Sequence, residues 1–162
     1  MTASSPSAIA LAGLLAEELR EVDAFVELLQ QEQEQLATSG NVDSLLPLVE
    51  KKSGFATRLA SLSNRRDRLL ADAGLEPGRA GMEALIAADP GASALASQWQ
   101  KLLAQAVEAR TLNDTNGKLI ARRLQHNQQA LEALMSATER AATYGPDGQQ
   151  RGGGSGRFLG SA

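Results

Sequence analysis

The sequence predicts an all-α fold, an antiparallel bundle of three long helices with coiled-coil-like seams followed by a flexible C-terminal tail. Apolar residues make up 43% of the 162 residues but aromatic residues only 3%, a balance typical of helix-on-helix packing. Apolar side chains recur at intervals of three and four in three long segments. Stretches rich in Gly and Pro separate these segments. We expect one helical domain, residues 1–144, and a tail, residues 145–162.

The first predicted helix covers about residues 7–37. Ser7 can cap its N-terminus. The apolar start has no preceding Lys or Arg, so we expect the first turns of a helix rather than a secretory signal. Glu32 and Glu34 lie in a polar run near the end, which we interpret as a solvated face. The apolar positions fall on one stripe: Leu11, Leu15, Leu19, Val22, Val26 and Leu29.

The second predicted helix covers about residues 43–73 and repeats the spacing through three heptads. Pro47 would break a helix interior. It therefore lies in the first turn, with Asp43 as N-cap, or it separates a short helical turn from the long helix that follows. The residues of this seam are Leu45, Leu48, Lys52, Phe55, Leu59, Leu62, Arg66 and Leu69.

The third predicted helix follows a linker, residues 75–92, in which residues 82–88 can form one or two helical turns. It covers about residues 93–142. Gly117 is a weak point, because a Gly inside a helix costs about 1 kcal/mol relative to Ala. The apolar spacing resumes on the same face after Gly117, so we expect one continuous helix.

Catalysis has little support in the sequence. No Cys is present, and the one histidine, His126, is typical of a solvated helix surface. We therefore expect no catalytic residues, no metal site and no cofactor. The net charge of −3 argues against nucleic acid as a partner, and no apolar stretch approaches the roughly 20 residues of a membrane span. We expect a cytoplasmic binding protein, with its oligomeric state left open.

Polar residues interrupt the apolar seams and leave two interpretations open. They are either polar layers that set the helix register, or parts of an open groove that accepts a helix from another protein. Trp99 has the same ambiguity between a core residue and a binding hot spot. The polar seam residues are Lys52, Arg66, Asn113, Asn116 and Asn127.

The tail begins with a distinctive segment. Tyr144 opens a turn-forming run of small and polar residues that extends to Gln149. This run is a simple helix stop or a short linear motif that docks on a partner.

Several segments together resemble the FlgN family of flagellar export chaperones. The likeness covers about residues 10–150. It is carried by Glu50-Lys51-Lys52-Ser53, by Trp99-Gln100, by Leu112-Asn113, Asn116-Gly117 and the run from Asn127 to Glu132, and by the segment from Tyr144 to Gln149.

The resemblance implies partners and sites. A family member is expected to bind the amphipathic C-terminal helices of the hook-filament junction proteins FlgK and FlgL, to prevent their premature association, and to deliver them to the export gate protein FlhA. Substrate contact would involve Asn113, Asn116, Ile120, Leu124, Asn127, Leu131 and Leu134. Gate docking would involve Tyr144, Gly145, Asp147, Gly148 and Gln149. Alternatives are a self-associating structural coiled coil and a chaperone for a different flagellar or secretion substrate.

Overall fold

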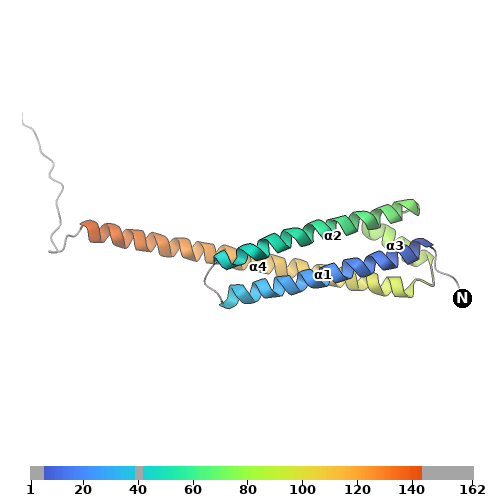
Figure 1. Cartoon of the computed structure of the whole chain (residues 1–162), viewed down its shortest axis with the longest axis horizontal. Helices are drawn as coiled ribbons and strands as arrows, with labels where there is room; N and C mark the ends of the chain where they lie inside the picture. Colours follow the sequence, from blue (N-terminus) through green and yellow to red (C-terminus); the bar gives the residue numbers. More distant parts are fainter. Residues whose placement is uncertain (1–5, 39–41, 144–162) are drawn as a thin grey trace, which may run out of the picture. The chain divides into compact units, whose positions relative to one another are not determined.

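The computed structural model describes residues 6–38 and 42–143, and every regular element in these ranges is helical (Figure 1). The all-α prediction is confirmed. The chain divides into two compact units, residues 1–120 and residues 121–162. The elements are α1 (Pro6–Thr38), the 3-10 turn η1 (Val42–Leu45), α2 (Leu46–Asp72), α3 (Gly78–Ala88) and α4 (Ser93–Thr143).

In the first unit, α1 and α2 form an antiparallel hairpin. Glu18 of α1 contacts Arg66 of α2, while Glu32, further along α1, contacts Lys52, which comes earlier in α2. The two helices therefore run in opposite directions at a fixed register. Asn116 of α4 contacts Glu32, and Trp99 lies beneath Arg66, so α4 runs parallel to α1 and antiparallel to α2.

The core of the first unit follows the predicted apolar stripes. Apolar side chains of α1 and α4 supply most of it, and α2 and α3 contribute Leu70 and Met82. A second, smaller cluster lies where α1 meets the start of α2, around Leu36 and Leu48. Side chains with no exposed surface are Leu11, Leu15, Leu29, Leu70, Met82, Glu32 and Asn116.

The linker predicted at residues 75–92 contains a helix longer than expected. α3 has 11 residues and buries Met82 fully, so the bundle has a short fourth helix in addition to the three long ones. Gly78 has a φ of 74°, a conformation that favours glycine, and its N–H donates to Asp67 Oδ1 at 2.8 Å. At Gly81 a Cβ would lie 1.8 Å from the carbonyl oxygen of Glu76, so α3 packs closely against the preceding turn.

The structure resolves the two alternatives for Pro47. η1 is a separate helical turn, and Pro47 follows it in the first turn of α2, where its missing N–H breaks no helical hydrogen bond. The N-cap of α2 is Leu45 rather than Asp43. α4 continues through Gly117 without a break, as the apolar spacing predicted.

Candidate functional site

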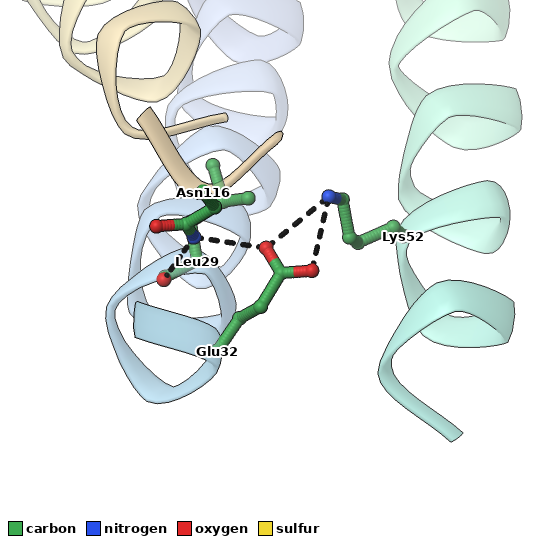
Figure 2. Close-up of polar contacts among 4 residues, drawn as sticks. All are labelled: Leu29, Glu32, Lys52 and Asn116. Atoms are coloured by element: carbon green, nitrogen blue, oxygen red, sulfur yellow. Dashed lines mark hydrogen bonds and ion pairs between the residues drawn. The ribbon is translucent and has the colours of Figure 1, made fainter. Parts of the chain in front are cut away.

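A buried polar layer crosses the first unit at Glu32 (Figure 2). Lys52 Nζ lies 3.2 Å from both carboxylate oxygens of Glu32. Asn116 Nδ2 donates to Glu32 Oε2 and to the carbonyl oxygen of Leu29, each at 2.8 Å. Glu32 has no exposed surface, so the interpretation of its polar run as a solvated face is wrong for this residue. α1, α2 and α4 each contribute one side chain to the layer.

A second buried layer lies two heptads away along both α1 and α2. Arg66 Nη1 donates to both carboxylate oxygens of Glu18, at 2.6 Å to Oε2, and Arg66 Nη2 donates to Ser63 Oγ at 3.0 Å. The guanidinium lies over the ring of Trp99, 5.3 Å from its centroid. Burial raises the pKa of Glu18 above its ordinary value, against the lowering effect of Arg66.

The two layers contain three of the polar residues that interrupt the apolar seams. Lys52, Arg66 and Asn116 are held by partners within the first unit, which favours the polar-layer interpretation for all three. The side chain of Asn116 is fully buried, so it is not exposed for the substrate contact that the resemblance implied for it. Trp99 is also buried in the core. Asn113 is exposed on α4.

In the second unit, the described part of α4 presents an exposed apolar surface. Residues spaced by three and four along a helix share one face. We name this surface the α4 stripe and define it by four side chains that are 51–64% exposed: Leu124, Leu131, Leu134 and Met135. The predicted residue Asn127 is exposed on the same face. Ile120, which belongs to the first unit, is half-buried against the smaller core cluster.

Met135 is a stripe residue that the sequence reasoning missed. It follows Leu134 directly and so falls one position off the strict heptad spacing, yet it is 56% exposed. Met135 lies four residues after Leu131, and residues at this spacing are neighbours on a helix surface, so the sequence does contain a signal for it. An exposed cluster of three leucines and a methionine has the composition of a surface that binds an apolar partner.

The remaining predicted residues divide into two groups. His126 lies exposed on α4. The predicted docking residues Tyr144, Gly145, Asp147, Gly148 and Gln149 lie outside the described residues. Across residues 6–38 and 42–143, no group of three or more His, Asp or Glu side chains is placed to hold a metal ion. Within the same ranges, no helix combines the length and the hydropathy that a membrane crossing needs.

Comparison with known proteins decides the family. The family model described as FlgN protein matches residues 1–152. The chain belongs to the FlgN family. This FlgN-family chain is 30% identical to "Flagella synthesis protein FlgN" of Yersinia enterocolitica over 140 residues, which are 85% of this chain and 87% of that protein. A protein of the same name from Yersinia enterocolitica serotype O:8 / biotype 1B gives the same figures. No solved structure matches the chain significantly.

Proposed function

We propose that this FlgN-family chain is a cytoplasmic flagellar export chaperone that binds the amphipathic C-terminal helices of the junction proteins FlgK and FlgL. The observation that carries the proposal is the α4 stripe. Exposed apolar side chains at helical spacing are the surface on which a second amphipathic helix docks. Family membership supports a role in flagellar synthesis. The proposed role requires binding and release and no chemical step.

The energetics of the stripe fit reversible binding. Burying one Leu or Met side chain contributes about 1.5–3 kcal/mol. Four such side chains offset part of the entropy that a free helix loses when it is ordered on the stripe. Covering the apolar face of a junction-protein helix also prevents that face from associating with another copy.

Co-purification tests this proposal most simply. The full chain is expressed together with the C-terminal segment of FlgK or of FlgL, each from the same bacterium. We expect a complex that survives gel filtration. If neither segment co-purifies with the chain, the proposed substrate assignment is wrong.

Delivery to the export gate is the second part of the proposal. We infer that Tyr144 and the four predicted residues near it, Gly145, Asp147, Gly148 and Gln149, contact the cytoplasmic domain of FlhA. An aromatic side chain in a short polar segment is a typical anchor for docking by a linear motif. We expect Tyr144→Ala to lower FlhA binding by about tenfold or more, as truncation of an interface hot spot does, while FlgK binding is unchanged. Equal loss of both activities in pull-down assays would refute this division of roles.

A self-associating structural protein is the second candidate, because the α4 stripe could also pair with a second copy. Sedimentation equilibrium separates the two candidates. A stable homo-oligomer that ignores both junction-protein segments would favour the structural role. A chain that binds neither segment but binds another flagellar or secretion protein would be a chaperone for a different substrate.

A further inference from the structure

A groove runs along the hairpin of α1 and α2. It consists of three adjoining hollows of about 430–470 Å³ each. Glu17 joins the first hollow to the second, Ser61 joins the first to the third, and Arg68 joins the second to the third, so the three are continuous. Their described lining residues all belong to α1 and α2, a different part of the chain from the α4 stripe. We name this feature the hairpin groove.

The hairpin groove has an excess of positive charge. Four arginines and two glutamates line it. Arg58 Nε lies 2.9 Å from Glu21 Oε2, and this glutamate is therefore already paired. Arg65 Nη1 lies 3.1 Å from Glu17 Oε2, which pairs the second glutamate as well. Because the whole chain has a net charge of −3, the groove is a cationic region on an anionic protein.

The other two arginines of the groove, Arg20 and Arg68, have no ion-pair partner among the described residues. Both are exposed. Arg20 lines the same hollow as Ser61, which precedes Arg68 by seven residues, or about 10 Å along α2. Two unpaired guanidinium groups at this spacing can each bind one carboxylate of the same ligand.

One end of the hairpin groove is apolar. Ile9 is 64% exposed and Leu69 is half-buried, and both line the hollow that contains Arg68. A Cβ at Gly13, in the same hollow, would meet no atom within 4 Å, so an apolar side chain of a ligand has room there. The ligand that complements this end of the groove is both apolar and anionic.

We propose that the hairpin groove binds an acidic segment of a protein other than the exported one. Two carboxylates of that segment pair with Arg20 and Arg68, and an apolar side chain beside them contacts Ile9. A short segment meets only the local charge of the groove, whereas a nucleic acid or an anionic membrane also meets the net negative charge of the chain. This inference does not rest on the proposed function, because it concerns a different surface and a different partner.

Fluorescence anisotropy with the full chain tests the charge of the ligand. The probe is a labelled peptide of Glu-Glu-Leu repeats, and a peptide of Gln-Gln-Leu repeats of the same length is its control. We expect saturable binding of the acidic peptide that weakens as salt is added, because salt screens exposed charges. The control peptide should bind about tenfold more weakly or less. Equal affinity for the two peptides, or no binding of the acidic one, would overturn the inference.

Charge-reversal variants locate the contact. Arg68→Glu breaks no ion pair of the described chain, so the fold is retained. We expect it to weaken acidic-peptide binding by about fivefold or more at low salt. Combining it with Arg20→Glu should weaken binding by about twentyfold or more, because sites about 10 Å apart act additively. Arg122→Glu, exposed on α4, is the control. If Arg68→Glu and Arg122→Glu weaken binding equally, the binding is non-specific and the groove is not its site.

A second pair of variants tests the apolar contact. Ile9→Gln and Val107→Gln each replace an exposed apolar side chain, 64% and 66% exposed, and only Ile9 lines the groove. Circular dichroism checks that both variants fold. We expect Ile9→Gln to weaken acidic-peptide binding by about fivefold, because the apolar area that the peptide buries is lost. Val107→Gln should bind like the wild type. Wild-type affinity in both variants would rule out the contact at Ile9.

The outcomes separate this inference from the proposed function. Arg68→Glu should leave FlgK-segment binding unchanged; if it weakens that binding too, the groove belongs to the substrate surface and the inference of a separate partner is wrong. If the chain binds phosphatidylglycerol vesicles and not the acidic peptide, the groove contacts a membrane and the inference is also wrong. If the acidic peptide binds through Arg68 while no junction-protein segment binds, the inference stands and the proposed function fails.

Discussion

Replacing Lys52 with Met tests whether the Glu32 layer holds the hairpin of α1 and α2 together. The two charges lie 3.2 Å apart, and Glu32 has no exposed surface while the Lys52 side chain is 22% exposed. At an effective dielectric constant of about 20 the attraction at this distance is about 5 kcal/mol. Removing one partner of a buried pair costs about 3–5 kcal/mol, because the other charge remains buried.

We expect a loss near the lower end of that range, about 3 kcal/mol of the free energy of unfolding for Lys52→Met. Lys52 is partly solvated, and Asn116 continues to donate to Glu32 after the substitution. Urea unfolding followed by circular dichroism measures the loss, provided that the slope with urea is unchanged. Lys51→Met is the control, because Lys51 is exposed, and it should change stability by less than about 0.5 kcal/mol.

A second substitution separates the buried charge from lost packing. Glu32→Gln keeps an oxygen that accepts from Asn116 and removes the negative charge. We expect the double variant with Lys52→Met to recover about 2 kcal/mol of the loss. A Lys52→Met variant that loses less than about 1 kcal/mol would refute the reasoning, as would a double variant no more stable than Lys52→Met alone.

Further predictions concern stability at Glu18 and at two glycines. Burial raises the pKa of Glu18 in the folded state. The contribution of Glu18 to the free energy of unfolding is therefore fully present below the ordinary pKa of a glutamate and is lost as pH rises through the folded-state pKa. Glu18→Gln should therefore gain stability relative to the wild type as pH rises toward neutrality, and a relative loss in urea unfolding would contradict this. Gly81→Ala should cost about 1–3 kcal/mol, because its Cβ would meet the Glu76 carbonyl. At Gly117 an added Cβ meets no atom within 4 Å, so Gly117→Ala should stabilise α4 by up to about 1 kcal/mol. If the melting temperatures of the two glycine variants shift in the same direction, these two predictions are wrong.

The long helices could be predicted because their apolar residues repeat at a period that only an α-helix satisfies. Leu11, Leu15 and Leu29 were named from that period and are fully buried. α3 was underestimated because Gly78 and Gly81 lower its intrinsic propensity, and the burial of Met82 stabilises it from outside. Local sequence carries no signal of that tertiary contact.

The contacts that form the candidate sites could not be predicted from the sequence, because they depend on how the helices pack against one another. Lys52 and Arg66 were recognised as unusual on their seam, but their partners lie in α1, and the pairing depends on the register of the hairpin. Glu32 belonged to a polar run of the sequence and is fully buried in the structure.

The role of the α4 stripe as the substrate surface is tested most directly by calorimetry with Leu134→Glu. Leu134 is 64% exposed, so the substitution leaves the core intact, and Gln129→Glu on the opposite exposed side of α4 is its control. Losing the burial of one leucine, about 1.5–3 kcal/mol, predicts FlgK-segment binding weaker by about tenfold to a hundredfold. The control should bind with wild-type affinity. A Leu134→Glu chain that binds the FlgK segment as tightly as the wild type would contradict the account.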